Sequence, residues 1–453
     1  MLRPAIRPLA AALLLVIGSA GAAIALMDGD APETGCGPVS GGAPDRTAVI
    51  QAALDAAGPG GTVQLAPCPE GEAHRVAGTL TLANRALIGP AAGKAAILCD
   101  QRGREADCLV LEGSTGGAPK PEIGSQLRDL LILGTGDGER GGGRDLIRIV
   151  RGDHIRLDGL VLQHARRHCI RVEPRGAYDW VENLFVLSVK CERAGGAGLH
   201  ALIPEHGDHL FQNEVLLVKF ETRGVGGHAL HLENRSRVGG GAAKQSKWRI
   251  VGSELAVHDD AGVDDIVMLE ARGAGLIEWI DIDGSTIERL GNGKVSGRCV
   301  GHATGGTGRI AALSIRGTIC YGAQGGLVDV AGLADSGLLV QQSTGLPGGG
   351  TPVLVPSIAS SFGTTPKLTA GGRVRLFTAE RSQAYLVTAR RRTDGAAGAS
   401  FMVWGCEAAH PLHPVDDLAL AANGGAEGGD GCDVVIANVD GAATAVDWSV
   451  LRL

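Results

Sequence analysis

The sequence predicts an all-β protein whose body is a right-handed parallel β-helix, with an N-terminal capping helix and a small C-terminal antiparallel β-sandwich. The first observation is a short phrase with Gly or Asn at its third place, which recurs between residues 146 and 345. The second is a short alternating apolar strand that follows each phrase after a loop. Successive phrases lie about 24 to 39 residues apart, which is the period range of solenoids.

The phrases predict corners. Gly and Asn tolerate a positive φ at low cost, so each phrase predicts a strand, one left-handed residue and a second strand. We therefore expect Asn183, Asn213, Gly252 and Gly284 to lie above one another in successive coils. The phrases are Leu157-Asp158-Gly159-Leu160, Val181-Glu182-Asn183-Leu184, Phe211-Gln212-Asn213-Glu214, Ile250-Val251-Gly252-Ser253, Ile282-Asp283-Gly284-Ser285 and Ile315-Arg316-Gly317-Thr318.

The alternative fold is an antiparallel β-sandwich built from the same short strands. Hairpin signals such as Asn-Gly between paired strands are scarce, which favours the solenoid. The composition agrees, because 72 glycines and only 3% aromatic residues suit a narrow core of small and β-branched side chains.

Residues 1–25 predict a targeting segment. Arg3 and Arg7 give a positive start, an apolar stretch follows, and small residues then offer a cleavage site. No charge occurs between Arg7 and Asp28, so the segment is also long enough for an uncleaved N-terminal membrane anchor. Either reading predicts an exported protein, which would be secreted, periplasmic or located in the cell envelope.

The ten cysteines predict disulfides, because an even number in an exported chain is typical of a disulfide framework. Cys169 and Cys299 directly precede strands, and Cys191 and Cys320 each lie eight residues before the next such strand. These matching places predict that each pair joins one coil to the next. The full nearest-neighbour set is Cys169–Cys191, Cys299–Cys320, Cys36–Cys68, Cys99–Cys108 and Cys406–Cys432.

Three regions follow from these patterns: the targeting segment at 1–25, the β-helix at 26–345 and a sandwich-like domain at 346–453. A short helix from about Asp45 to Gly58 has one apolar face and could cover the open end of the solenoid. Beyond residue 346, strands separated by turn-rich loops lack the corner phrase. Such a tail could mediate homo-oligomerisation, bind carbohydrate or only close the end.

The stretch from Asp45 to Gly89 resembles the opening of the pectate-lyase-like right-handed β-helix superfamily. The motifs that carry the resemblance are D-x-T-A-x-I-Q-A-A-L-D-A-A-G, then G-G-T-V-x-L-x-P, a strand ending L-T-L, and L-I-G. The resemblance implies the fold; its members include lyases, epimerases, glycoside hydrolases and adhesion spikes. The aromatic residue usual after the P-x-G turn is absent, which weakens assignment to a subfamily.

Two columns of outward side chains are expected on one face of the β-helix. In an alternating strand with Ile170 and Val172 inward, Arg171 and Glu173 point outward. Stacked coils extend this parity into an exposed trough. The first column is Arg148, Arg171, His200, His231, Met268 and Asp329, and the second is Val150, Glu173, Leu202, Glu233, Glu270 and Ala331.

The candidate site residues are Arg171, Glu173, His200, His231 and Glu233. A histidine could remove the proton next to a uronate carboxylate while Arg171 neutralises that carboxylate. Glu173 and Glu233 are two coils apart, near the wide end of inverting glycosidase separations. Nine of the thirteen histidines lie in this part of the chain, His168 and His228 among them.

Glu233 and Glu270 are adjacent, so one could take up a proton or both could hold Ca²⁺. The partner that suits this face is an extended anionic polysaccharide. A net charge of −7 gives no electrostatic case for nucleic acid. We therefore predict a polysaccharide lyase or related uronate-modifying enzyme. The alternatives are a non-catalytic glycan-binding surface protein, a glycoside hydrolase and a structural envelope protein.

Overall fold

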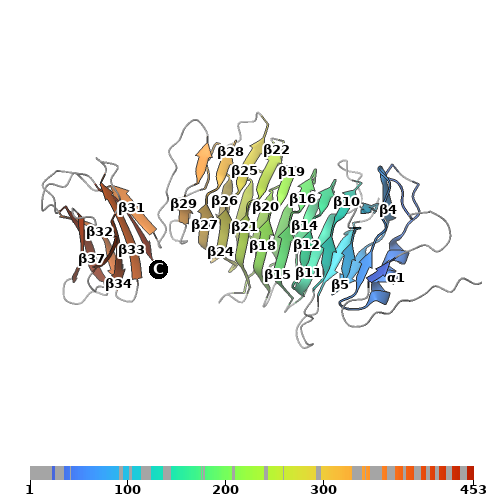
Figure 1. Ribbon diagram of the computed structural model, residues 1–453, viewed down its shortest axis with the longest axis horizontal. Coiled ribbons are helices and arrows are strands. Elements are labelled where there is room, and N and C mark those ends of the chain that lie inside the picture. The colour runs from blue at the N-terminus through green and yellow to red at the C-terminus, as the bar shows by residue number, and fades with distance from the viewer. Residues whose placement is uncertain are drawn as a thin grey trace, which may run out of the picture.

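The body of the computed structural model is a parallel β-helix of the right-handed type, which confirms this part of the predicted fold (Figure 1). It describes residues 23–25, residues 35–346 with short gaps, and the strands between residues 360 and 452. The gaps are at 41, 91–94, 102–104, 114–123, 136–143, 175, 177–178, 207–209, 239–242, 259, 292–296, 329–338 and 342.

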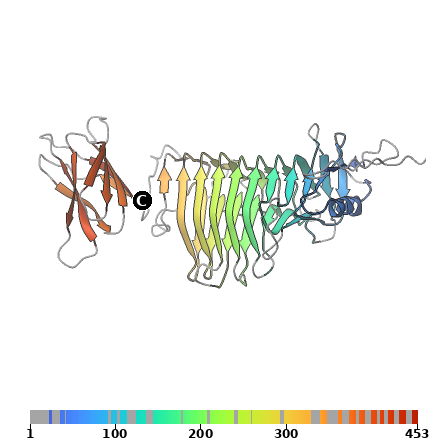
Figure 2. The same ribbon diagram turned by 60° about the horizontal axis from the view of Figure 1, so that its bottom comes forward.

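Three parallel sheets form the faces of the β-helix, and each coil from β3 to β26 contributes one strand to each sheet. Strands of one face stack along the long axis, as Figure 2 shows. Sheet I contains β3 (Thr62–Gln64), β6 (Ala86–Ile88), β9 (Gln126–Arg128), β12 (Arg156–Asp158), β15 (Trp180–Leu187), β18 (Phe211–Val218), β21 (Lys244–Val251), β24 (Leu276–Asp283), β27 (Arg309–Arg316) and β29 (Leu339–Gln341).

Sheet II contains β4 (Glu72–Val76), β7 (Ala95–Cys99), β10 (Leu130–Gly134), β13 (Val161–Gln163), β16 (Lys190–Glu192), β19 (Glu221–Val225), β22 (Glu254–His258), β25 (Thr286–Leu290), β28 (Ile319–Tyr321) and β30 (Thr344–Leu346). Sheet III contains β5 (Leu80–Ala83), β8 (Leu109–Glu112), β11 (Asp145–Asp153), β14 (His168–Val172), β17 (Leu199–Ile203), β20 (Leu230–Asn234), β23 (Val267–Ala271) and β26 (Val300–Thr304). β11 continues into sheet I at its end.

The corners between sheets I and II are made by left-handed residues that stack in register. The N–H of Gly252 donates to the carbonyl of Asp283 in the next coil at 2.9 Å, and the N–H of Gly284 donates to Arg316 at 2.9 Å. The inward side chains between these corners form one continuous apolar core. The stacked corner residues are Asp129, Gly159, Ser188, Lys219, Gly252, Gly284 and Gly317.

One part of the corner prediction is wrong. Asn183 is left-handed, but it lies inside β15 and stacks in a second ladder with Glu214, Lys247, Trp279 and Ala312. Asn213 pairs with Ser246 in sheet I and is not left-handed. Asn183 and Asn213 therefore do not lie above Gly252 and Gly284.

The true corners of those two coils are Ser188 and Lys219, with φ of 51° each. Their N–H groups donate to Val218 and Val251 of the next coil at 2.9 and 3.1 Å. Pairing between coils thus holds two residues in a conformation that neither type favours by itself. The prediction of a β-helix still holds, because two ladders of left-handed residues run along the structure.

The helix α1 (Thr47–Ala57) lies beside the first coils at the N-terminal end of the stack (Figures 1 and 2). It buries Ile50, Ala53 and Leu54 in the apolar core. Asp45 accepts the N–H of Thr47 at 3.0 Å, next to the start of the helix. The capping role of α1 stays a prediction. The short β2 (Gly37–Pro38) pairs antiparallel with β4. Ala73 of β4 belongs to a small, separate apolar cluster with Ala96 and Leu98.

Beyond the β-helix, the chain forms two antiparallel sheets, and their packing as a β-sandwich stays a prediction. The five-stranded sheet contains β31 (Ser360–Thr364), β38 (Val446–Arg452), β33 (Ala384–Arg391), β34 (Ala399–Trp404) and β35 (Ala409–His413). The three-stranded sheet contains β32 (Arg373–Glu380), β37 (Gly431–Asn438) and β36 (Leu418–Gly424).

Four predicted disulfides are confirmed: Cys36–Cys68, Cys99–Cys108, Cys169–Cys191 and Cys299–Cys320. Cys191 pairs with Leu162 across coils, so its bond to Cys169 does join one coil to the next. The predicted Cys406–Cys432 bond lies outside the described residues. Of the targeting segment, the structure describes only β1 (Ala23–Ala25), which runs parallel to β3.

The corner ladder predicts that backbone conformation alone makes Gly284 costly to replace. An added Cβ would meet no atom within 4 Å at either Gly284 or Gly262, but only Gly284 has a positive φ, of 56°. Gly284→Ala should lower the free energy of unfolding by about 1–2 kcal/mol. Gly262→Ala is the matched control and should be nearly neutral. Urea unfolding measures both, and equal effects would contradict the corner role.

Candidate functional site

The two predicted side-chain columns are present in sheet III and keep the predicted order through Met268. Arg148 pairs with Arg171, Arg171 with His200, and His200 with His231. In the second column, Leu202 pairs with Glu233 and Glu233 with Glu270. After Met268 the first column continues with Gly301. Asp329 and Ala331 lie outside the described residues.

The expected exposed trough is not what the structure shows. Arg171 and His200 are each only 8% exposed, and Glu233 is 1% exposed. His231 and Glu173 are partly accessible, with 15% and 19% of their side-chain surface exposed. Neighbouring charged side chains pair with the column residues and help to bury them. Solvent and ligand can therefore reach the histidine of β20 more readily than that of β17.

The middle of the site holds two copies of a His–Glu–Arg triplet, one coil apart. In the first, Nε2 of His200 lies 2.9 Å from Oε2 of Glu233, which also forms an ion pair with Arg235. In the second, Nε2 of His231 lies 3.2 Å from Oε2 of Glu270, which forms an ion pair with Arg272. Each carboxylate thus accepts a hydrogen bond from the previous coil's histidine and pairs with an arginine two residues later, just past the end of its own strand.

The carboxyl groups of the site are all held in the ionised form. Burial would raise the pKa of Glu233, but the hydrogen bond from His200 and the neighbouring His231 and Arg235 lower it to about 2. The hydrogen bond from His231 lowers the pKa of Glu270, against burial and the charge of Glu233. A shared proton between Glu233 and Glu270, one of the two expected uses of this pair, is therefore not supported.

Arg171 and Glu173 pair with each other, which leaves Arg171 little accessible surface. Glu173 also accepts from Arg148 at 2.9 Å, and Arg148 reaches Asp107 at 3.1 Å. Burial acts to raise the pKa of Glu173, but the arginines hold it below its usual range. The charged groups of this cluster therefore pair with one another, on the N-terminal side of the triplets.

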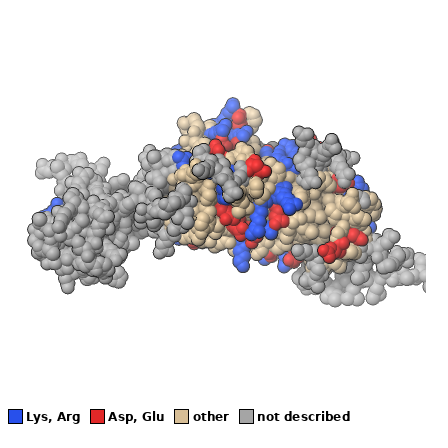
Figure 3. Space-filling view, turned by 90° about the horizontal axis from the view of Figure 1, so that it is seen from above, with Lys and Arg blue, Asp and Glu red and all other residues tan. Residues whose placement is uncertain are grey.

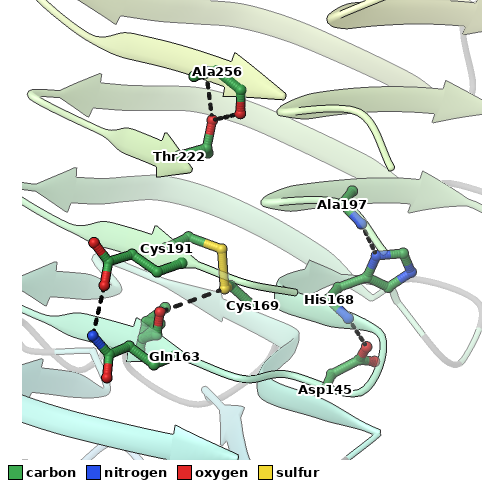
Figure 4. Close-up of a disulfide and its surroundings, with 10 residues drawn as sticks. Asp145, Gln163, His168, Cys169, Cys191, Ala197, Thr222 and Ala256 are labelled. Atoms are coloured by element: carbon green, nitrogen blue, oxygen red, sulfur yellow. Dashed lines mark hydrogen bonds between the residues drawn. A yellow bond between two sulfur atoms is a disulfide. The ribbon is translucent and has the colours of Figure 1, made fainter. Parts of the chain in front are cut away.

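His168 and His228 complete the site, and the sequence interpretation gave them no role. Nδ1 of His168 accepts the backbone N–H of Ala197 at 2.9 Å, as Figure 4 shows, and its Nε2 lies 3.3 Å from Nδ1 of His200. Nδ1 of His228 lies 2.7 Å from the carbonyl oxygen of Asp265. A signal was available, because each of the two histidines lies three residues before a first-column residue.

Four imidazole rings therefore lie against one another. The rings of His200 and His231 stack at 4.6 Å with an angle of 6° between their planes. His168 meets His200 edge-on at 4.8 Å, and His228 meets His231 in the same way. Burial lowers the pKa of His168 and of His200, and burial together with the charge of His231 lowers the pKa of His228 to about 4.

Among the described residues, no hydrogen bond reaches Nδ1 of His231, whereas its Nε2 is held by Glu270. A histidine with one nitrogen oriented by a carboxylate and the other available can act as a general base. Both ring nitrogens of His200 are engaged, by His168 and Glu233. Of the two histidines expected to act as base, the geometry favours His231.

Metal binding gains limited support from these residues. Ligand atoms of His200, His231 and Glu233 lie within 4.8 Å of one another. The Nε2 atoms of both histidines are already held by carboxylates, that of His200 by Glu233 and that of His231 by Glu270. Ca²⁺ between Glu233 and Glu270 would displace a histidine and an arginine from each carboxylate.

Positive and negative side chains are interspersed over the face seen in Figure 3 rather than separated by sign. This pattern agrees with the mild net charge of −7.

Within the part of the chain that the structure describes, no helix has the length and apolarity of a membrane crossing.

No protein-family model matches the chain, and neither does any curated protein. Solved structures do resemble it. The tailspike gp49 of Acinetobacter baumannii bacteriophage Fri1, a capsular polysaccharide depolymerase, is 12% identical, with 90% of this chain and 82% of that chain covered and a TM-score of 0.32. The A-module of the Azotobacter vinelandii mannuronan C-5 epimerase AlgE6 is 15% identical, with 67% and 96% covered and a TM-score of 0.33. Likeness at this level transfers no activity.

The histidine cluster predicts that stability falls with acid. A pKa lowered to about 4 in the folded state means that the unfolded chain binds more protons between pH 4 and 6.5. His228 thus contributes stability above pH 6.5 that is lost as pH falls toward 4. Replacing it in His228→Phe should reduce the slope of unfolding free energy against pH by up to about 1.4 kcal/mol per pH unit in this window. Urea unfolding between pH 4 and 8 measures the slope; an unchanged slope would show that His228 does not titrate as described.

Proposed function

We propose that this protein is an enzyme that acts on an anionic polysaccharide by proton abstraction, with His231 as the general base. The observation that carries the proposal is the His231–Glu270 pair. Glu270 holds Nε2 of the imidazole at 3.2 Å, and the partly accessible ring keeps Nδ1 for a substrate proton. A base that a carboxylate orients in this way is a recurrent arrangement in catalysis.

Hydrolysis fits the site less well. A glycoside hydrolase needs one carboxylic acid that is protonated near neutral pH, so its pKa must be raised. The pKa values of Glu173, Glu233 and Glu270 are all lowered, because each carboxylate receives hydrogen bonds or ion pairs from histidine or arginine. A site with three ionised carboxylates lacks the acid that would protonate a leaving sugar.

The substrate carboxylate would be neutralised by arginine. Arg171, the residue expected in this role, is bound to Glu173 and little exposed. Arg235 and Arg272 have 44% and 61% of their side chains exposed, and each uses only part of its guanidinium on a glutamate. Their remaining N–H groups could pair with a uronate carboxylate and stabilise the negative charge that develops when the adjacent carbon loses its proton.

β-Elimination is favoured over epimerisation. In elimination, His231 takes the proton from the carbon next to the carboxylate, the bond from the neighbouring carbon to the glycosidic oxygen breaks, and a carbon–carbon double bond forms. The same imidazolium can return its proton to the departing oxygen. Epimerisation needs a second group that delivers a proton to the opposite face of the sugar ring, whereas elimination can proceed with His231 alone.

A non-catalytic glycan-binding protein is the second candidate, favoured by one specific observation. Every carboxylate of the triplets is already paired, so the network is stable without any ligand.

For either function we propose that the protein works outside the cytoplasm, since four disulfides persist in oxidising compartments. The C-terminal sheets are proposed to form a sandwich that mediates homo-oligomerisation.

The test is a panel of pectin, alginate and neutral glycans assayed for unsaturated product by ultraviolet absorbance. We expect product from an anionic polymer only, and a loss of about 10²–10⁴-fold in kcat for His231→Gln, since general-base catalysis contributes roughly that much. His258→Gln is the control, because His258 is exposed on sheet II and bonds to Asp260.

The outcomes separate the candidates. Reducing ends without unsaturation would indicate a hydrolase, and retention in affinity gels without turnover would indicate a binder. Full activity in His231→Gln would exclude His231 as the base even if the reaction class is correct.

A further inference from the structure

We propose that His168 is a positioning residue. Through it, the backbone N–H of Ala197 fixes where the proton lies in a chain from His168 through His200 to Glu233. The chain holds His200 in a single neutral form beneath His231. The proton assignment stands on geometry alone; its effect on catalysis rests on the proposed function.

The first link starts from a donor that cannot change. A backbone N–H stays protonated at every accessible pH, so Nδ1 of His168, which accepts it at 2.9 Å, must present a lone pair. A neutral imidazole carries one proton, and here the only remaining place for it is Nε2. The N–H of Ala197 therefore selects the Nε2–H tautomer of His168.

In the second link, the tautomer of His168 determines the tautomer of His200. Nε2–H of His168 faces Nδ1 of His200 at 3.3 Å, so this nitrogen must also present a lone pair. A doubly protonated His200 would place two N–H groups against each other. His200 is thus neutral with its proton on Nε2, from which it donates to Glu233 at 2.9 Å. No other arrangement satisfies all three contacts.

The local fold supports the first link. A Cβ on Gly196 would lie 2.8 Å from Nδ1 of His168, so glycine is what allows the ring to approach the backbone. On its other side, the backbone N–H of His168 donates to Asp145 at 3.2 Å, and the next residue, Cys169, is bonded to Cys191 (Figure 4). The ring is therefore placed by the chain on both sides.

The hydrogen-bonded chain from His168 to Glu233 affects the charge next to His231. His231 stacks on His200 at 4.6 Å, so a charged His200 would oppose the imidazolium that forms when His231 accepts a substrate proton. A neutral His200 removes that repulsion. It also leaves Glu233 ionised near His231, where its negative charge favours the imidazolium. His168 would act through His200 and Glu233, without touching substrate.

The experiment is ¹⁵N NMR of the histidine-labelled full-length protein at pH 7, in which ring nitrogen shifts distinguish the two neutral tautomers from the charged ring. We expect His168 and His200 both as neutral Nε2–H forms. His200 found charged, or with its proton on Nδ1, would overturn the proposal in the unmodified protein, whatever the variants do.

Two variants test the direction of control. His168→Phe removes the donor, and we expect His200 to leave the single Nε2–H form. His168→Gln keeps an N–H donor near the position of Nε2 and should restore it. His228→Phe is the matched control, since it removes a similarly placed ring outside the chain, and should leave the form of His200 unchanged. An unchanged His200 in His168→Phe would show that Glu233 alone sets its state.

The catalytic arm uses the polymer that yields unsaturated product. His168→Phe should lower kcat about tenfold at unchanged KM, the scale of losing an orienting partner, and His168→Gln should recover most of it. If no polymer is cleaved, the proposed function fails while the NMR result still decides the proton assignment. Normal kcat in His168→Phe with an altered His200 would refute the catalytic link only.

Discussion

The hydrogen bond from each corner N–H to a carbonyl of the next coil is the interaction on which the rest of the structure depends. It satisfies a backbone donor at a place where the chain leaves one sheet and enters another. Because the bond recurs in coil after coil, it sets the same advance at every corner. Side chains separated by a whole coil in sequence consequently lie in contact, and this is how His200 meets both His231 and Glu233.

The inner side of the corners has its own polar ladder. Ser253 accepts the N–H of Phe220 at 3.1 Å, and Ser285 accepts the N–H of Ser253 at 3.2 Å. The residue after the left-handed glycine is therefore small and hydroxylated for a reason, since a buried N–H without a partner would cost about 1–3 kcal/mol. The spacing between coils that allows these buried hydrogen bonds also sets the distance between successive side chains in the outward columns.

The sequence was sufficient for the β-helical body, four disulfides and the order of both columns through Met268, because these depend on parity and period. It was insufficient for the corners at Ser188 and Lys219, where contacts between coils override residue preference. It also placed the site in the open, whereas pairing with Arg235 and Arg272 covers the glutamates. That pairing depends on rotamers, which period and parity do not encode. The roles of His168 and His228 were missed because they lie just before the alternating strands.

Unequal coil lengths have a consequence for how such a site can diversify. The chain between Arg171 and His200 is shorter than that between His231 and Met268, yet both pairs lie in register. Loops between strands absorb the difference, so insertions and deletions can accumulate there while the spacing of the side-chain columns is preserved. Loops of different length could thus surround the same stack of histidine rings without moving the rings out of register.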